Sequence, residues 1–154
     1  MNNEKETENV TNDVTKATWH VDAEVSKAFA IELARMTFSR NCSNVVVLDL
    51  NGRSPVARYF VLATGTSNQQ VRSVGDDLAD FGKHGGNRPY GSAGLQEGRW
   101  AVVDFVDVIV HVFDKEFRDF YNLEMLWGDA PHVDWETGYE GVQDDGFGPG
   151  VEIH

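Results

Sequence analysis

The chain has 154 residues, 41% of them hydrophobic, which suits one folded domain with a buried core. Its 13 basic and 25 acidic residues give a formal net charge of −12, which excludes a nucleic-acid binder that relies on a concentrated basic face. The single cysteine, Cys42, excludes an internal disulfide framework and a cysteine-rich zinc site. No apolar run approaches the roughly 18 residues of a membrane span, and the N-terminus is unlike a signal sequence, so we expect a soluble, cytoplasmic protein.

The acidic residues are concentrated at the two ends of the chain. Residues 1–13 hold four acids and one lysine, and residues 129–154 hold seven acids and no base. Residues 14–128 keep 14 acids and 12 bases, so the middle is nearly neutral. This distribution fits a positively charged partner, because the field of the protein then raises the association rate. Acidic ends that only maintain solubility are the alternative.

The first third of the chain predicts a disordered segment, a helix and a strand. Residues 1–20 carry too little apolar surface to fold alone, so we expect them to be disordered and acidic. Apolar residues at near-helical spacing predict an amphipathic helix over residues 21–38. The run at residues 45–48 is typical of a strand covered on both faces, and residues 51–55 have turn chemistry. The apolar positions of the helix are Val21, Val25, Phe29, Leu33 and Met36.

The middle of the chain predicts a second strand and a capped helix. Residues 59–63 form the strand, and Thr66 or Ser67 is a suitable N-cap for the helix that follows. The helix should end before Gly85, and Tyr90 is expected in a short strand after it. The apolar side of the helix consists of Val71, Val74, Leu78 and Phe81.

Two neighbouring strands are predicted at residues 100–104 and 107–113 from their alternating side chains. In the first strand Trp100, Val102 and Asp104 share a face. In the second strand one face consists of Asp107, Ile109, His111 and Phe113.

A short helical region should follow these strands. Asp114 can cap a helix that runs to about Tyr121, and Gly128 with Pro131 ends the last helical turn. The chain therefore predicts one small α/β domain over residues 21–131, with a mixed sheet flanked by helices. Residues 132–154 are expected to be a flexible, acidic, glycine-rich tail.

Candidate catalytic features are weak. The turn at residues 65–67 could bind phosphate at a helix N-terminus, but a plain N-capped turn explains it equally well. The nearest candidates for a metal-binding carboxylate group are Asp49, Asp104 and Asp107, which do not form an Asp-x-Asp pair. The five histidines show no metal-ligand spacing, and no nucleophile stands out. We therefore predict no catalytic, cofactor or metal site.

The aromatic residues are the stronger signal. Phe117, Phe120, Tyr121 and Trp127 follow helical spacings, and we expect the phenylalanines to lie in the core. Trp100 and Trp127 each lie at the end of an element beside charged residues. A tryptophan in such a place is a common interface anchor, because it combines a large apolar area with one hydrogen-bond donor.

Several long motifs in order resemble the ribosomal silencing factor (Iojap) family. The first half of the likeness consists of residues 47–52 (VLDLNG) and 59–67 (YFVLATGTS). The second half consists of residues 98–104 (GRWAVVD), 107–113 (DVIVHVF) and 120–131 (FYNLEMLWGDAP). The likeness covers roughly residues 22–131.

The resemblance implies a specific function and fold. Members of the family bind the large ribosomal subunit through ribosomal protein L-fourteen and sterically prevent the small subunit from joining, which represses translation. The implied fold is related to nucleotidyltransferases but lacks their catalytic carboxylates. Carried over to this chain, the partner-binding residues are Trp100, Asp104, His111, Phe113, Tyr121, Glu124 and Trp127.

Three positions depart from the family pattern. Arg58 replaces a usually acidic residue, residues 68–70 replace a stretch that usually contains a basic residue or histidine, and Val106 replaces a turn glycine.

The alternative function is a magnesium-dependent, nucleotide-binding enzyme related to nucleotidyltransferases. Homodimerisation through the face of the late strands is a third hypothesis, and direct sequence-specific nucleic-acid binding is not expected.

Overall fold

The computed structural model describes residues 23–141, which form a five-stranded mixed sheet and its covering helices. The predicted segment 1–20 and residues 142–154 lie outside the described residues. The strand order is β1-β2-β5-β4-β3; β2 and β5 are parallel, and the other neighbours are antiparallel. The α/β fold with a mixed sheet is therefore confirmed. The strands are β1 (Ser43–Asp49), β2 (Tyr59–Thr64), β3 (Gly91–Ala93), β4 (Trp100–Asp104) and β5 (Val108–Phe113).

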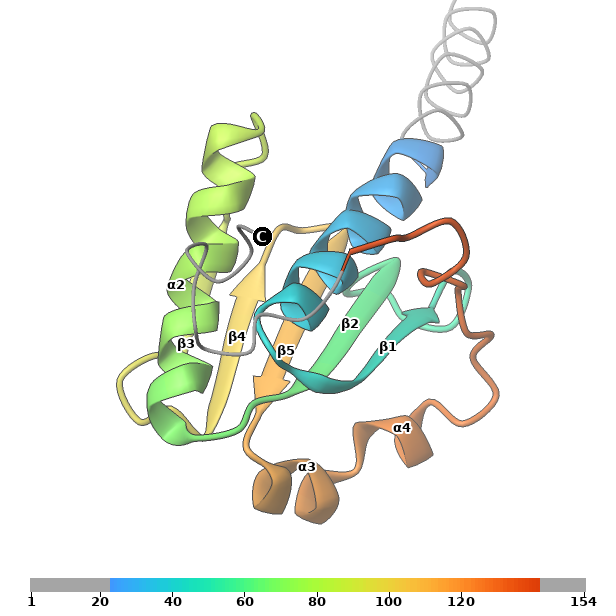
Figure 1. The fold of residues 1–154 in the computed structure, drawn as a ribbon. Coiled ribbons are helices and arrows are strands. Elements are labelled where there is room, and N and C mark those ends of the chain that lie inside the picture. The colour runs from blue at the N-terminus through green and yellow to red at the C-terminus, as the bar shows by residue number, and fades with distance from the viewer. Residues whose placement is uncertain (1–22, 142–154) are drawn as a thin grey trace, which may run out of the picture.

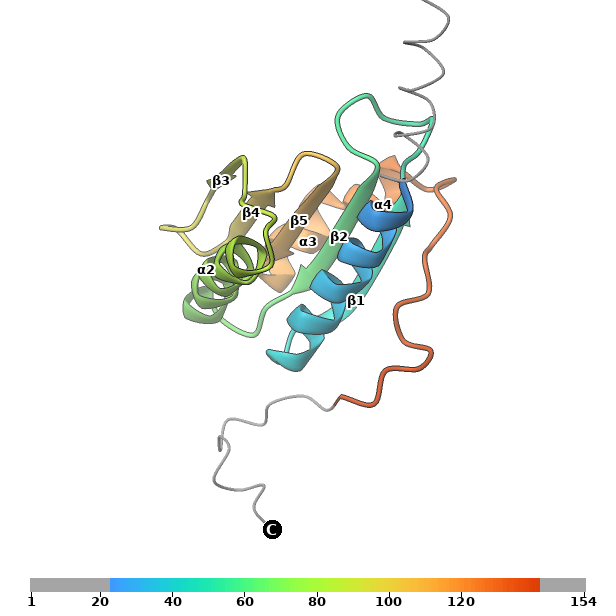
Figure 2. The same ribbon diagram turned by 90° about the horizontal axis from the view of Figure 1, so that it is seen from above.

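Helices cover the two faces of the sheet unequally. The first helix, described over residues 23–39, and α2 (Asn68–His84) lie on one face (Figure 1). The much shorter α3 (Lys115–Tyr121) and α4 (Leu123–Leu126) lie on the other face, as the view from above shows (Figure 2). Within residues 23–141, no helix is both long enough and apolar enough to cross a bilayer.

Helix α2 begins and ends where its sequence predicts. The backbone N–H of Gln70 donates to Oγ of Ser67 at 3.1 Å, which satisfies a free amide of the first turn. Gly85 forms the C-cap. The positions predicted to face inward, Val71, Val74 and Leu78, are buried, whereas Phe81 is 37% exposed and lies at the margin of the apolar side.

Strands β4 and β5 pair as the alternation predicts. Trp100 lies opposite Phe113, and Val102 lies opposite His111, so these side chains share one face. The turn between the strands contains Val106 at φ 75°, a left-handed conformation that is unusual for a β-branched residue. Tyr90 was expected in a strand but lies just before β3 and is 80% exposed.

The structure differs from the predicted flexible tail over residues 132–141, which run along β1 (Figure 2). The N–H of Val133 donates to the carbonyl of Val47 at 2.8 Å, and Nε1 of Trp135 donates to the carbonyl of Val45 at 3.0 Å. Trp135 is only 7% exposed, and Nε of Arg35 donates to its carbonyl at 2.8 Å. The glycine-rich, acidic composition of this segment predicted flexibility, because composition does not show that the single indole of Trp135 is buried against β1.

Replacing Trp135 with alanine should destabilise the protein by about 3–5 kcal/mol, because a large buried side chain is lost from the core. Urea denaturation followed by circular dichroism measures this change. The control is Val56→Ala, since Val56 is 64% exposed and should change stability by less than about 0.5 kcal/mol. Equal stability of the two variants would show that residues 132–141 do not dock in solution.

Replacing Val106 with asparagine should stabilise the protein by about 1 kcal/mol, because asparagine tolerates the left-handed conformation at lower cost. Val106 is 55% exposed, so little packing is lost. The melting temperature should rise by about 4 °C. Val106→Thr keeps the β-branched side chain and should give no gain; a gain of the same size in both variants would rule out relief of backbone strain.

Candidate functional site

A cluster of aromatic rings lies on the sheet face that α3 and α4 cover only in part. The Trp100 ring lies 4.9 Å from the Phe113 ring and 4.8 Å from the Tyr121 ring, measured between centroids. Trp100 is half-buried and Tyr121 is 46% exposed, whereas Phe113 is buried. Residues from β4, β5 and α3 therefore form one continuous aromatic surface, with Phe113 beneath it.

His111 supports this surface from below. It is 7% exposed, and its Nδ1 accepts a hydrogen bond from Nε1 of Trp100 at 3.0 Å. Burial lowers the pKa of His111 from 6.5 to about 4, so the imidazole is neutral at physiological pH. A neutral, buried ring suits a supporting role, and its polar tip does not reach solvent.

Trp127 joins the same cluster through Phe60. The Phe60 ring lies 4.6 Å from the His111 ring and 6.2 Å from the Trp127 ring, edge-on to both. Trp127 is half-buried and packs against the core between the sheet and α3–α4. Five of the seven predicted partner-binding residues are thus brought together, namely Trp100, His111, Phe113, Tyr121 and Trp127.

The two predicted acidic residues are both engaged in hydrogen bonds within the protein. Asp104 is on the same strand face as Trp100 but four residues along, which is about 13 Å away. Its Oδ1 accepts from the N–H of Val106 at 2.7 Å, so the carboxylate also shapes the turn. Glu124 accepts from Nε of Arg118 at 3.0 Å and is therefore paired inside the protein.

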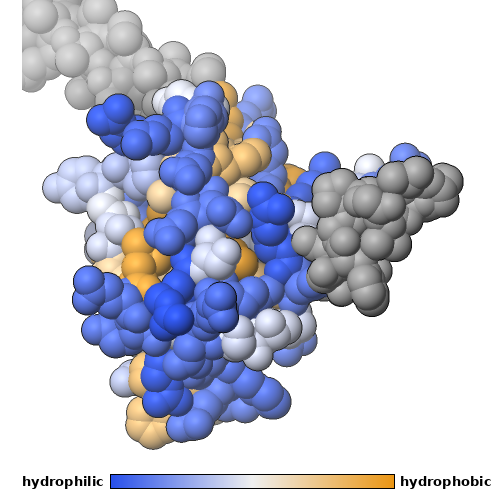
Figure 3. All heavy atoms as spheres, turned by 60° about the vertical axis from the view of Figure 1, so that its left-hand side comes forward, coloured by the Kyte–Doolittle hydropathy of each residue, from blue (hydrophilic) through white to orange (hydrophobic). Residues whose placement is uncertain are grey.

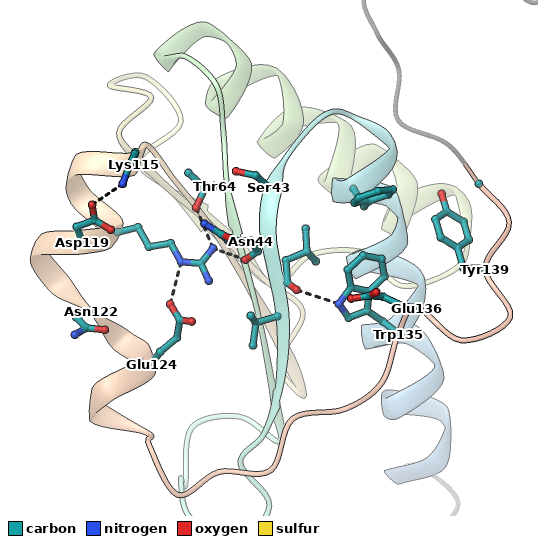
Figure 4. A pocket seen from close by; sticks show the side chains of 15 residues that line it. Ser43, Asn44, Thr64, Lys115, Asp119, Asn122, Glu124, Trp135, Glu136 and Tyr139 are labelled. Carbon is teal, nitrogen blue, oxygen red and sulfur yellow. Dashed lines mark hydrogen bonds and ion pairs between the residues drawn. The ribbon is translucent and has the colours of Figure 1, made fainter.

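Arg118 is one of the residues that line an open cleft of about 860 Å³ beside the beginning of β1. It is 7% exposed, and its Nη1 donates to Oγ1 of Thr64 at 2.9 Å and also to the carbonyl of Asn44. Figure 4 shows the α3–α4 segment on one side of the cleft and Trp135 with Tyr139 on the other. The hydrogen bonds of Arg118 attach α3 to β1 and β2, which gives this arginine a structural function.

Three exposed apolar side chains on α3 and α4 were not identified as exposed from the sequence. Phe120, Met125 and Leu126 are 77%, 78% and 69% exposed. The expectation that Phe120 lies in the core is wrong, because in the seven-residue α3 the half-buried Phe117 and its i+4 neighbour Tyr121 occupy the stripe that faces the sheet. In Figure 3 the face toward the viewer is mostly hydrophilic, with apolar side chains in several separate places, one of them at its lowest part, at the level of α3 and α4.

The three candidate metal-binding carboxylates do not converge. Asp49 accepts from the N–H of Asn51, Asp104 accepts from that of Val106, and Asp107 accepts from Oγ of Ser26. Among residues 23–141, no group of three or more histidine, cysteine, aspartate or glutamate side chains could hold a metal ion. The three carboxylates on which the alternative of a metal-dependent enzyme depends are thus each engaged in a separate hydrogen bond.

The turn at residues 65–67 is already engaged in hydrogen bonds within the protein. The N–H of Gly65 donates to the carbonyl of Phe113 at 2.7 Å, and the N–H of Thr66 donates to Oε1 of Gln70 at 2.6 Å. The hydroxyl of Ser67 caps the helix. Two amides that a phosphate-binding turn would offer are thus occupied, and the plain N-capped turn is the better description.

Fold and surface together define a small α/β protein with a partly exposed aromatic surface on one sheet face. The family model described as "Ribosomal silencing factor during starvation" matches residues 23–147. The chain therefore belongs to the ribosomal silencing factor family.

Individual relatives agree with this assignment. The chain is 40% identical over 99 residues to "Ribosomal silencing factor RsfS" of Bacillus subtilis (strain 168), covering 64% of this chain and 84% of the relative. It is 31% identical over 126 residues to "Protein Iojap, chloroplastic" of Arabidopsis thaliana, covering 79% of this chain and 51% of that protein.

Solved structures show the same fold. A crystal structure of a Chromobacterium violaceum protein matches with a TM-score of 0.61 and 31% identity, covering 68% of this chain and 85% of that one. A Bacillus halodurans structure matches with a TM-score of 0.57 and 29% identity, covering 73% and 97%. The nucleotidyltransferase-like topology that the resemblance implies stays a prediction.

The buried His111 should make stability depend on pH. In the unfolded chain a histidine binds a proton below about pH 6.5, whereas the folded protein resists protonation of His111 until about pH 4. Stability is therefore full above pH 6.5 and falls as the pH drops toward 4, and His111 alone accounts for a loss of about 2.5 kcal/mol at pH 4.5.

Urea denaturation at pH 7 and pH 4.5 tests this by comparing the wild type with His111→Asn, which has no titrating group at this position. The wild type should lose about 2.5 kcal/mol more than the variant between the two pH values. Identical losses would mean that His111 is not held neutral by burial.

Proposed function

We propose that this protein binds the large ribosomal subunit through ribosomal protein L-fourteen, sterically blocks the joining of the small subunit, and thereby represses translation. Membership in the ribosomal silencing factor family supports this role. The observation that carries the proposal is the aromatic surface around Trp100, on a sheet face that its own helices leave partly uncovered. Large side chains that remain accessible in one place are typical of a surface for another macromolecule.

The residues of this surface differ in function. Trp100 and Tyr121 keep accessible ring area and serve as anchors, and Trp127 borders them through Phe60. His111 and Phe113 lie beneath and act through the rings above them. The apolar side chains Phe120, Met125 and Leu126 enlarge the surface along α3 and α4.

Charge contributes mainly to the rate of encounter. The chain carries a formal net charge of −12, and ribosomal protein surfaces that face RNA are rich in basic residues. Asp104 is half-buried at the edge of the same face and can pair with a basic side chain of the partner. Glu124 is already paired with Arg118, so its contribution is to hold α4 in place.

Truncating Trp100 to alanine should weaken binding to the large subunit about thirtyfold or more, because loss of a buried interface anchor costs about 2 kcal/mol or more. Co-sedimentation with separated large subunits measures the affinity, and a subunit-joining reaction with purified small subunits measures the block. Wild type should travel with large subunits and reduce joined ribosomes; Trp100→Ala should do neither at the same concentration.

Phe81→Ala is the matched control, since it also truncates an accessible aromatic ring but lies on α2, against the opposite face. It should bind as the wild type does. Analytical ultracentrifugation of each protein alone separates a loss of ribosome binding from a loss of self-association through the same surface. Wild-type protein that stays at the top of the gradient would refute the proposed function.

A further inference from the structure

The only hydrogen-bond donor of the Trp100 side chain is used inside the protein. An indole has a single polar group, its Nε1–H, and no acceptor. In this structure that group donates to Nδ1 of His111 at 3.0 Å, a normal hydrogen-bond length. A partner that meets Trp100 therefore meets its ring atoms and no available N–H.

We infer that His111 is a positioning residue of the binding surface: it fixes the orientation of the Trp100 indole, so that Trp100 recognises an apolar or cationic group of the partner rather than a hydrogen-bond acceptor. The partner side of this inference rests on the proposed function. The fixing of the indole concerns the free protein and can be tested without any partner.

Strand register creates the contact. His111 lies opposite Val102, and Trp100 is two residues before Val102 in β4, so Trp100 and His111 are diagonal neighbours on one face. Diagonal neighbours are within reach of long aromatic side chains. Packing on Phe113 and Tyr121 restrains the indole but does not by itself select between its two flipped orientations, because the terminal χ angle of tryptophan is broad. The hydrogen bond to His111 makes that selection.

The protonation of His111 is fixed by the same bond. Because Nδ1 accepts, the proton of the neutral ring resides on Nε2. Nε2 is buried and has no hydrogen-bond partner within the described residues. The imidazole is held between Phe60, at 4.6 Å and edge-on, and Phe113, at 6.0 Å and stacked.

Burying a histidine here lowers stability unless its ring makes a compensating interaction with another group. A buried N–H without an acceptor destabilises a protein, and an aliphatic residue would fill the same space without that cost. The acceptor at Nδ1 is the feature that an aliphatic residue lacks. Within the described residues, Nδ1 accepts its hydrogen bond from the indole of Trp100, the proposed anchor of the surface.

The chemistry of the partner follows from what the indole still offers. Its faces accept aliphatic chains and attract ammonium or guanidinium groups. A backbone carbonyl or a carboxylate would find no donor there. Trp100→Phe keeps an apolar, π-bearing ring, so it should weaken binding to large subunits by less than about fivefold, in contrast to the loss expected for Trp100→Ala.

The first test measures hydrogen exchange of the Trp100 Nε1–H by NMR on the free, full-length protein, with the signal assigned from Trp100→Phe. His111→Leu removes the acceptor and should speed exchange at least tenfold. His111→Asn restores an acceptor near the position of Nδ1 and should stay within about threefold of wild type. If His111→Leu does not fold, His111→Phe provides a second variant without an acceptor. Equal exchange in the wild type and the acceptor-free variant would overturn the inference.

The second test is a double-mutant cycle on large-subunit affinity. His111→Leu should raise the dissociation constant about tenfold in the wild-type background and leave it unchanged in the Trp100→Phe background. An equal effect in both backgrounds would show that His111 acts independently of Trp100 and would overturn the inference. If the wild type does not bind large subunits, the proposed function fails, and the exchange measurement still decides whether His111 fixes the indole.

Discussion

The parallel pairing of β2 with β5 is the constraint on which the rest of the structure depends. Every residue of both strands is buried, so both faces of this central pair need cover. Parallel neighbours also require a long crossover, and here the crossover contains α2, which together with the first helix covers one face. The other face receives only α3 and α4, of seven and four residues. That cover does not extend over all of β4, and Trp100 and Val102 are left half-buried. The aromatic surface is thus a consequence of the fact that helices cover the two faces of the sheet unequally, while its central strands are buried on both faces.

Contacts with strand β1 hold the segments that flank the aromatic surface in position. It is an edge strand, and such edges expose unpaired backbone groups that favour unwanted strand pairing. Residues 131–135 cover part of it with hydrogen bonds to Val45, Val47 and Asp49. From the other direction Arg118 reaches the carbonyl of Asn44 and the hydroxyl of Thr64, while Glu124 balances its charge. Arg118 is buried and would lose these partners if α3 moved, so α3, α4 and the rings that they carry depend on contacts far away in sequence.

Local sequence patterns were sufficient to predict the helices and strands. They were not sufficient to predict contacts between residues far apart in the sequence. The cap at Ser67, the apolar side of α2 and the alternation in β4 and β5 are properties of neighbouring residues, and the structure has them as predicted. Trp135 becomes part of the core only because β1 lies beside it, 90 residues earlier in the chain. Phe120 is exposed because α3 has room for only one inward stripe, which spacing alone does not reveal. The bond between Trp100 and His111 needs the register of two strands, and the residues that meet a partner stay predictions.

Several polar groups near the surface are hydrogen-bonded within the protein. Asp114 caps α3 through the N–H of Phe117 and pairs with Arg99, Asp104 holds its turn, and the indole of Trp100 is bonded to His111. Groups occupied in this way are poor at taking up protons, metal ions or phosphate, because each new contact would first break an existing one. They are well suited to hold large rings in fixed positions, and a rigid anchor loses little conformational entropy on binding. The same hydrogen bonds thus preorganise the rings of this sheet face, as the proposed binding function requires.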